Sequence, residues 1–356
     1  MRRLFLEPLY ANGNDMKSKD RLPDKKSKVT VREVALLAQV SETTVSRIMR
    51  KEGSVANETR ERVMNAVREL GYVPNRLAGS LASLNTNLVG VLVPSLQNIV
   101  FPEVLRGIQA GLSGSHMQAV TSVTDYDFAT EESMVRGLLA WNPAAVLVTG
   151  LNHNEATSRM LRQSSGRVVE MMEVDSEPID VAVGMFHRSA GYETARYLLQ
   201  KGYRHFGYVA HDIGPDRRAR LRHEGMAQAL SEAGLGFIAE SRAETPSSIG
   251  IGKVMTARLL ERAPDVKVAI YSNDDMAVGG VFHCMEAGLS IGSDLSIFGF
   301  NGLEIGRHLP QPLSTMRSNR FLIGKTAIEQ ILQSPERPAE PVRIDTGFEI
   351  VEGATA

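Results

Sequence analysis

The chain has 356 residues, of which 43% are hydrophobic and 23% are charged, a composition typical of a globular protein with two or three folded units. This composition excludes a mainly disordered chain, and the apolar stretches are too short for a membrane span or a secretory signal. The single cysteine, Cys284, excludes an internal disulfide and a thiolate zinc cluster, so we expect a protein of the cytoplasm.

The net charge of −1 conceals an uneven distribution of charge along the chain. Residues 1–76 hold 16 Lys and Arg against 10 Asp and Glu, whereas the remaining residues hold 24 against 31. A basic N-terminal part favours a polyanionic partner, because Lys and Arg neutralise the phosphates of nucleic acids. The alternative is a basic tail that only improves solubility.

Residues 1–28 show no sustained periodicity, and we expect them to form a flexible arm. Ordered structure is predicted from Thr30, because Thr30 and Glu33 have the spacing of a capping box. Ser41 is expected to cap a second short helix. Both helices carry an apolar stripe at helical spacing.

Only Gln39 and Val40 separate these two helices, so the helices cannot lie antiparallel and the arrangement matches a helix-turn-helix. A third helix is expected over 57–70, with Gly71 as its stop. The second helix turns polar side chains outward: Glu42, Thr43, Ser46, Arg47 and Arg50. The pattern alone fits an ordinary helical core as well as a DNA-reading unit.

Four segments of this region together resemble the DNA-binding headpiece of the lactose/galactose repressor (LacI/GalR) family. They are 31–35 (VREVA), 40–47 (VSETTVSR), 59–63 (TRERV) and 70–78 (LGYVPNRLA). The resemblance implies a small all-α helix-turn-helix headpiece over 29–73. One difference is Gln39, which stands where the family often has glycine, and a left-handed backbone there would cost Gln about 1 kcal/mol.

The resemblance also assigns roles in DNA binding. Arg47 is expected to make a bidentate contact to guanine, with Glu42 and Thr43 as the variable pair of base-reading residues. Glu42 either accepts a hydrogen bond from a cytosine amino group or points away from the DNA. Phosphate contacts are expected from Thr30, Ser41, Thr44, Ser46 and Arg50.

Residues 74–87 are expected to form a hinge helix or linker. The segment is too short to be a stable isolated helix but is able to form one when a partner orders it. In the resembling family this hinge folds on operator DNA, and a leucine at the position of Leu81 wedges into the minor groove. The residues that match the family's minor-groove pattern are Asn75, Arg76 and Ala78. A plain linker is the alternative.

From residue 88 onward, short apolar runs alternate with helical stretches, which indicates βαβ units and parallel sheets. The expected strands are 88–93, 144–149, 168–172, 205–209, 268–272 and 295–299. The expected helices are 101–112, 130–141, 190–200, 217–233, 253–261 and 275–287. The length exceeds one typical doubly wound sheet, so we predict two similar α/β lobes with a ligand cleft beyond the carboxyl ends of their strands.

The resemblance to the family continues to about residue 350. It implies a periplasmic-binding-protein-like effector domain of two doubly wound lobes over 88–350, with one lobe at about 87–186 and 319–345 and the other at about 188–315. The landmarks are 94–98 (PSLQN), 220–225 (RLRHEG), 272–279 (SNDDMAVG) and 298–302 (FGFNG). Within the family, the chain resembles the gluconate-utilisation repressor branch at 93–96 (VPSL), 101–108 (FPEVLRGI) and 180–184 (DVAVG).

By position in the family, four side chains are expected to bind the effector: Ser95, Arg222, Asn273 and Asn301. Amide and hydroxyl groups exchange hydrogen bonds with hydroxyls, and a guanidinium donates two parallel hydrogen bonds to a carboxylate. Family members that bind neutral sugars often have Asp at the position of Asn301. The missing negative charge beside Arg222 favours an anion, so we expect a sugar acid such as gluconate. Taken alone, Arg222 would fit a surface ion pair.

Phe186 and His187 stand where the family usually has Asp and Asn. His187 either donates to a ligand or is structural, and we leave its role open. Asp274 and Asp275 resemble a catalytic pair of carboxylates, but at the start of a helix a capping role fits them better. The chain shows no catalytic constellation and no metal site, so we expect neither an enzyme nor a cofactor other than an effector.

The expected function is therefore a homodimeric transcriptional repressor. It would read a palindromic operator and be released when a sugar acid binds between the lobes. The alternatives are a cytoplasmic sugar-binding protein, or a regulator that responds to a neutral sugar or to a corepressor. No membrane partner is expected.

Overall fold

The computed structural model describes residues 29–50, 54–73, 86–96 and 99–356. The chain forms two compact units, residues 1–79 and 80–356. The arm expected over 1–28 and most of the expected hinge, 74–85, lie outside the described residues. Among the helices that the structure describes, none is long and apolar enough to cross a bilayer.

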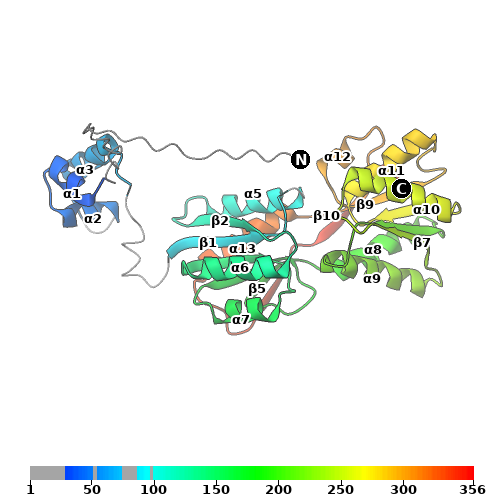
Figure 1. Ribbon diagram of the computed structural model, residues 1–356, viewed down its shortest axis with the longest axis horizontal. Helices are drawn as coiled ribbons and strands as arrows, with labels where there is room; N and C mark the ends of the chain where they lie inside the picture. Colours follow the sequence, from blue (N-terminus) through cyan, green and yellow to red (C-terminus); the bar gives the residue numbers. More distant parts are fainter. Residues whose placement is uncertain (1–28, 51–53, 74–85, 97–98) are drawn as a thin grey trace, which may run out of the picture. The chain divides into compact units, whose positions relative to one another are not determined.

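The described residues of the first unit form three helices, which confirms the all-α prediction (Figure 1). They are α1 (Val31–Ala38), α2 (Glu42–Met49) and α3 (Asn57–Leu70). Their apolar stripes meet in one small core, in which the buried side chains are Val34, Ala35, Ala38, Val45, Ile48, Val63 and Ala66. This core fixes the angle between α1 and α2 and leaves the polar side of α2 outside.

The helix ends follow the predicted caps. The Thr30 hydroxyl accepts from the Glu33 N–H, and the Glu33 carboxylate accepts from the Thr30 N–H at 2.7 Å, which completes a capping box. The Ser41 hydroxyl accepts from the Thr44 N–H at 3.1 Å. Gln39 adopts φ 55° and ψ 47°, so this residue takes the left-handed turn that glycine usually takes.

The second unit has two six-stranded sheets, each at the centre of one lobe (Figure 1). In lobe N the strand order is β11-β5-β4-β3-β1-β2, and in lobe C it is β12-β10-β9-β8-β6-β7. The strands of lobe N are β1 (Thr86–Val93), β2 (Gln118–Val123), β3 (Pro143–Thr149), β4 (Arg167–Glu173), β5 (Val181–Met185) and β11 (Val342–Asp345). Those of lobe C are β6 (Phe206–Ala210), β7 (Phe237–Arg242), β8 (Val268–Tyr271), β9 (Ser296–Asn301), β10 (Ser314–Ser318) and β12 (Phe348–Val351). Among the strands of the described residues, only β12 pairs antiparallel, with β10.

Helices cover both faces of each sheet, which confirms two doubly wound lobes (Figure 1). In lobe N one face is covered by α5 (Val100–Leu112) and α13 (Arg320–Gln333), and the other by α6 (Phe128–Leu139) and α7 (Glu155–Gln163). In lobe C one face is covered by α8 (His187–Gln200) and α9 (Arg217–Glu232), and the other by α10 (Ile249–Arg262) and α11 (Asp274–Ala287). A short helix, α12 (Glu304–Arg307), follows β9.

The chain passes from one lobe to the other after β5, after β10 and after β11. Lobe C therefore includes the final strand, β12, which the range expected for this lobe, about 188–315, leaves out. The Ile297 N–H donates to the Thr355 carbonyl at 2.8 Å, so the tail after β12 also joins lobe C. The sequence pattern missed β2, β5, β7, β10, β11 and β12. The edge strands β2 and β7 bury few side chains and lack a continuous apolar run.

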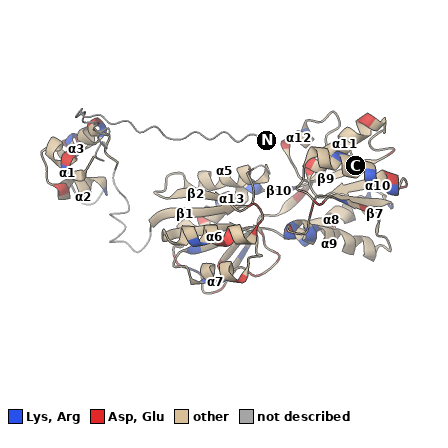
Figure 2. Cartoon of the chain, in the orientation of Figure 1, with Lys and Arg blue, Asp and Glu red and all other residues tan. Residues whose placement is uncertain are grey.

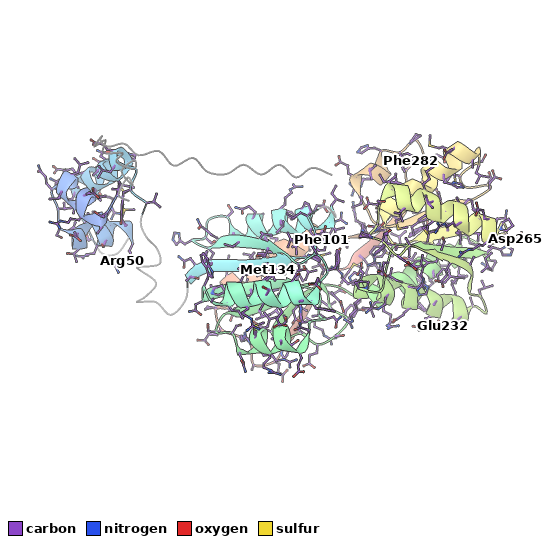
Figure 3. The ribbon with its side chains drawn as sticks, in the orientation of Figure 1. Arg50, Phe101, Met134, Glu232, Asp265 and Phe282 are labelled. Atoms are coloured by element: carbon purple, nitrogen blue, oxygen red, sulfur yellow. The ribbon has the colours of Figure 1, made fainter. Side chains whose placement is uncertain are left out.

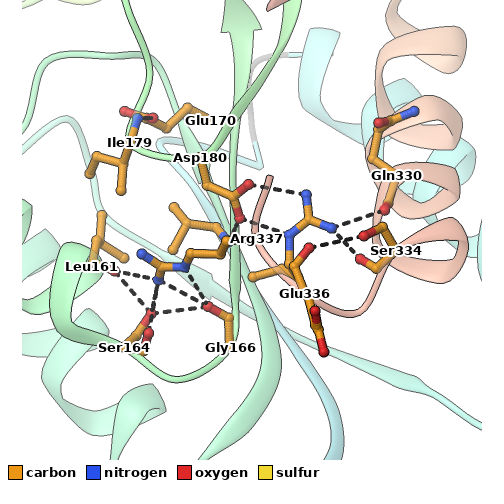
Figure 4. A network of polar contacts seen from close by, with 12 residues as sticks. Leu161, Ser164, Gly166, Glu170, Ile179, Asp180, Gln330, Ser334, Glu336 and Arg337 are labelled. Atoms are coloured by element: carbon orange, nitrogen blue, oxygen red, sulfur yellow. Dashed lines mark hydrogen bonds and ion pairs between the residues drawn. The ribbon is translucent and has the colours of Figure 1, made fainter. Parts of the chain in front are cut away.

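A buried ion pair fixes α13 to the sheet of lobe N (Figure 4). The Arg167 guanidinium donates to both carboxylate oxygens of Asp180, at 2.8 and 3.0 Å. It also donates to the backbone carbonyls of Gln330 and Ser334, at the end of α13. Arg337 donates to several carbonyls at the end of α7. Because each buried charge has a partner and hydrogen bonds, the pair holds the lobe's last helix in place.

A second buried charge cluster lies in lobe N at His153. Its Nδ1 lies 2.7 Å from a carboxylate oxygen of Glu131 on α6, and its Nε2 lies 3.4 Å from one of Glu170 on β4. Burial alone would lower the pKa of His153, but hydrogen bonds to the two carboxylates and their charges outweigh burial and raise this pKa to about 9. The imidazolium therefore joins α6 to β4.

We expect the second unit to lose stability as the pH rises from about 6.5 to about 9. The pKa of His153 is 6.5 before folding and about 9 after it, so the stabilisation is complete below pH 6.5 and disappears through pH 9. This shift corresponds to about 3 kcal/mol. Urea unfolding at several pH values between 6 and 9 measures the decline, and a His153→Gln variant should lose it. An equal decline in both proteins would contradict the prediction.

Candidate functional site

The base-reading residues predicted for the headpiece lie on the outer side of α2. Glu42, Thr43 and Arg47 are exposed, while Val45 and Ile48 of the same helix are buried in the core. Ser46 and Arg50, which are predicted to contact phosphates, differ in exposure. Ser46 is half-buried, and Arg50 is exposed at the end of the helix. The structure thus gathers the predicted base-reading side chains on one polar helix face.

Three of the four predicted phosphate-contacting hydroxyls, those of Thr30, Ser41 and Thr44, lie at helix N-termini, whereas Ser46 lies further along α2. Thr30 caps α1, and the Ser41 hydroxyl lies 2.9 Å from that of Thr44 in the first turn of α2. Free N–H groups and the helix dipole make such ends favourable for phosphate oxygens. The remaining predicted DNA contacts lie outside the described residues: Asn75, Arg76, Ala78 and Leu81.

A cavity of about 330 Å³ lies between the two lobes of the second unit. All four side chains predicted to bind the effector line it: Ser95, Arg222, Asn273 and Asn301. Ser95 follows β1, Asn273 follows β8 and Asn301 ends β9, so three of the four stand at the carboxyl ends of parallel strands. Arg222 comes from α9, where the start of the helix carries a run of basic residues (Figure 2).

Arg222 is a buried cation, with 6% of its surface exposed. One terminal nitrogen donates to the Ser272 carbonyl at 3.1 Å, and the other lies 3.2 Å from Nδ1 of His187. The guanidinium carbon lies 4.1 Å from the ring centroid of Phe300. Within the described part of the chain, no carboxylate forms an ion pair with Arg222. Burial lowers its pKa, but an arginine remains charged at any physiological pH.

His187, the residue whose role the sequence left open, lines the cavity beside Arg222. Its Nε2 lies 2.8 Å from the Met172 carbonyl and must donate to it, so Nδ1 accepts from Arg222. Burial and the charge of Arg222 hold the pKa of His187 well below its usual value. A neutral imidazole therefore orients the guanidinium without neutralising its charge.

Close packing between α8 and α9 places His187 and Arg222 together. A Cβ atom on Gly191 would lie 1.9 Å from the backbone oxygen of Arg222, and one on Gly225 would lie 2.0 Å from that of Arg188. Neither helix could approach the other this closely with a larger residue at the crossing. The two glycines therefore set the depth at which Arg222 enters the cavity.

The backbone around the cavity is unusually strained. Of the six non-glycine residues with positive φ in the described part of the chain, four line the cavity: Asp125, Tyr126, Met172 and Asn301. Arg320 of lobe N donates to the Asn301 carbonyl and to Glu103, and so holds this conformation. Such strain is found mainly at functional sites.

Asn273 has a double role, because its side-chain oxygen caps α11 by accepting from the Met276 N–H at 3.1 Å. The capping role predicted for Asp274 is wrong. This buried carboxylate accepts from the Thr315 hydroxyl at 2.7 Å and from the Leu303 N–H at 2.6 Å, and burial raises its pKa to about 6. Asp274 thus supports the cavity wall.

The sequence reasoning missed five carboxylates that line the same cavity: Asp125, Asp212, Asp216, Glu244 and Asp275. Four of them come within a few residues of the ends of β2, β6, β7 and β8, and that position was the signal that could have identified them. Asp216 caps α9 and lies 3.5 Å from Arg218 and from His211. Although burial opposes ionisation, Arg218, His211 and the charge of Arg222 hold the pKa of Asp216 well below its usual value.

A helix-turn-helix unit on the same chain as a two-lobed binding domain defines a ligand-responsive DNA-binding regulator. Residues 30–75 match the family of bacterial regulatory proteins of the lacI type, and residues 195–356 match a periplasmic binding protein-like domain. The chain belongs to the lacI family of bacterial transcriptional regulators, which bind DNA and are not enzymes.

Known relatives cover nearly the whole chain. The HTH-type transcriptional regulator GntR of Pseudomonas aeruginosa is 35% identical over 90% of this chain and 94% of its own. The HTH-type transcriptional regulator IdnR of Escherichia coli is 32% identical over 92% of this chain and 98% of its own. A solved structure of a LacI-family regulator from Silicibacter pomeroyi has a TM-score of 0.85 and 41% identity, over 92% of this chain and 99% of that one.

Proposed function

We propose that this protein is a homodimeric repressor that binds a palindromic operator and releases it when a small sugar acid, such as gluconate, occupies the cavity between the lobes. It acts in the cytoplasm and needs no cofactor besides this effector. The observation that carries the proposal is the buried Arg222, with which no described carboxylate forms an ion pair.

A buried charge without an ion-pair partner is costly, so its retention favours a ligand that supplies the opposite charge at contact distance. Arg222 already contacts three neutral partners: an imidazole, a carbonyl and an aromatic ring. These orient the guanidinium and leave its charge for the ligand. A carboxylate accepts two parallel N–H bonds from a guanidinium, which favours an organic acid.

The other lining residues suit a polyhydroxylated chain. Ser95 and Asn301 carry hydroxyl and amide groups at the ends of β1 and β9, and Asp275 adds a half-buried carboxylate. Hydroxyls of a sugar acid would donate to the carboxylate and exchange hydrogen bonds with the amide. A carboxylate at one end and hydroxyls along the rest of the molecule therefore match the cavity.

Release of the operator requires that the effector bind two arrangements of the lobes with different affinity. Contacts between the lobes surround the cavity. Arg217 of lobe C donates to Glu173 of lobe N, and Arg320 of lobe N donates to the Asn301 carbonyl of lobe C. An effector beside Asn301 acts on one of these contacts directly, which supports coupling between the cavity and the arrangement of the lobes.

An exposed apolar face on lobe C supports the homodimer. Phe282 and Met285 on α11 are 40% and 63% exposed, and Val254 on the neighbouring α10 is 46% exposed (Figure 3). Large apolar side chains gathered on two adjacent helices are typical of a subunit interface. Two headpieces in one dimer would read two half-sites, which explains why the operator is expected to be palindromic.

The proposal is tested by measuring fluorescence anisotropy of DNA from the protein's own promoter region, with and without gluconate, 2-ketogluconate or glucose. Gluconate or its keto form should weaken DNA binding by about 5- to 150-fold, the range of ordinary allosteric coupling. Glucose should have no effect because it supplies no charge for Arg222. Release by glucose alone would make the effector a neutral sugar, and tighter DNA binding with gluconate would make it a corepressor. Either result would refute the proposal.

A further inference from the structure

The charges around the cavity are divided between an inner and an outer zone. We call the buried side chains His187, Arg222, Asn273 and Phe300 the floor. We call the exposed carboxylates Asp125, Asp212 and Glu244, which line the same cavity, the rim. The floor carries the positive charge of Arg222, and the rim carries three negative charges.

The other charged lining residues do not change this division. Asp216 caps α9 and pairs with Arg218 at 3.5 Å, and its charge also acts on Arg222 without forming an ion pair with it. Asp275 is half-buried, and burial raises its pKa. Arg222 is therefore the positive charge that the cavity offers to a ligand.

The rim carboxylates are not neutralised by the protein. Within the residues that the structure describes, none of Asp125, Asp212 and Glu244 forms an ion pair with a basic side chain. Asp212 accepts only a backbone hydrogen bond, from the Gly214 N–H at 2.9 Å. The three residues come from three loops, after β2 in lobe N and after β6 and β7 in lobe C, so both lobes contribute exposed negative charge to the cavity lining.

We infer that the cavity selects sugar acids whose far end is uncharged and discriminates against those that carry a terminal phosphate. The inference rests on the proposed function, in which the ligand carboxylate binds Arg222. A ligand held in this way extends its other end toward the rim. Terminal hydroxyls would donate to the rim carboxylates, whereas a phosphate, which is mostly dianionic at neutral pH, would be repelled by them.

Isothermal titration of the full-length protein with gluconate and 6-phosphogluconate tests the inference. At low ionic strength we expect 6-phosphogluconate to bind more weakly than gluconate, by on the order of tenfold or more. The rim is exposed to solvent, so its repulsion should be screened by salt. Raising the salt concentration to about 0.5 M should therefore narrow the ratio of the two dissociation constants.

A triple variant removes the rim charges with little change of shape: Asp125→Asn, Asp212→Asn and Glu244→Gln. Asn tolerates the left-handed backbone at Asp125, where φ is 51°, and its oxygen can still accept from the Gly214 N–H at position 212. The ratio of the two dissociation constants should fall toward one. The matched control, Glu261→Gln, Asp265→Asn and Glu336→Gln, removes three exposed carboxylates that do not line the cavity and should keep the wild-type ratio.

The outcomes separate this inference from the proposed function. Equal binding of the two acids to the wild-type protein, or an unchanged ratio in the triple variant, would overturn the inference, while release of the operator by gluconate would leave the proposed function intact. If the ratio of the two dissociation constants also fell toward one in the control variant, the effect would come from the overall charge of the protein, and the inference would be overturned. Failure of both acids to bind would remove the proposed function and this inference together.

Discussion

Replacing Arg222 with alanine should abolish the response of operator binding to gluconate and leave operator binding without gluconate nearly unchanged. Loss of a buried charge partner costs about 2–5 kcal/mol of binding free energy, so the variant should bind the effector about 30- to 4,000-fold more weakly. Arg222 lies in the second unit of the chain, whereas the predicted DNA contacts lie in the first unit and the hinge. The two activities should therefore separate in this variant.

Stability distinguishes an effector-binding role of Arg222 from a structural one. A buried cation without an ion-pair partner lowers the stability of the empty protein, so Arg222→Met, which keeps much of the side-chain volume, should leave the thermal midpoint unchanged or raise it. If Arg222 served the fold, the same change would lower the midpoint. The effector itself should raise the midpoint of the wild-type protein and not that of the variant.

The control for these measurements is Arg196→Ala. Arg196 is exposed on α8 and pairs with Glu193 on the same helix, so this change removes the same charge away from the cavity. Arg196→Ala should respond to gluconate as the wild type does. A normal gluconate response in Arg222→Ala would mean that the ligand binds elsewhere, and loss of operator binding in that variant would mean that Arg222 holds the fold together.

The fold was predictable where one residue pattern determines the structure. The caps at Thr30 and Ser41 and the stop at Gly71 depend on neighbouring residues only, and all three were located correctly. The buried strands β3 and β4 were predicted from their apolar runs, although the equally buried but shorter β5 was missed. Edge strands lack such runs, and the antiparallel pairing of β12 with β10 depends on a long-range contact that no local pattern encodes.

The site was only partly predictable, because several of its residues act through tertiary neighbours. Arg222 was found by its place in a family motif, but its lack of a carboxylate partner became evident only from the packing of α9 against α8. The role of His187 depends on which atom faces the Met172 carbonyl. The rim carboxylates lie in three loops that are distant in sequence, so their convergence on one cavity is a property of the fold.

Replacing Arg47 with alanine should weaken binding to the natural operator strongly and relax the preference for one base in each half-site. A bidentate contact to guanine contributes about 1–3 kcal/mol, so the two half-sites read by a dimer would lose about 2–6 kcal/mol. Arg47 suits this contact because it is exposed on the outer face of α2, while Val45 and Ile48 fix that helix in the core. Binding to DNA panels with every base at each position measures both effects.

The salt dependence of binding decides whether Arg47 reads a base or holds a phosphate. If Arg47 contacts a base, Arg47→Ala should show nearly the same slope of log affinity against log salt concentration as the wild type. If Arg47 contacts a phosphate, the variant should lower the magnitude of that slope by about one for each lost contact. Arg47→Lys keeps the charge but loses the planar fork, so it should also lose the base preference. The control is Arg68→Ala on α3. It removes an exposed arginine that donates a hydrogen bond to Asn65, and this variant should keep the wild-type base preference. If Arg47→Ala binds all DNA sequences more weakly by the same factor and its affinity depends less on salt, Arg47 is a phosphate contact instead.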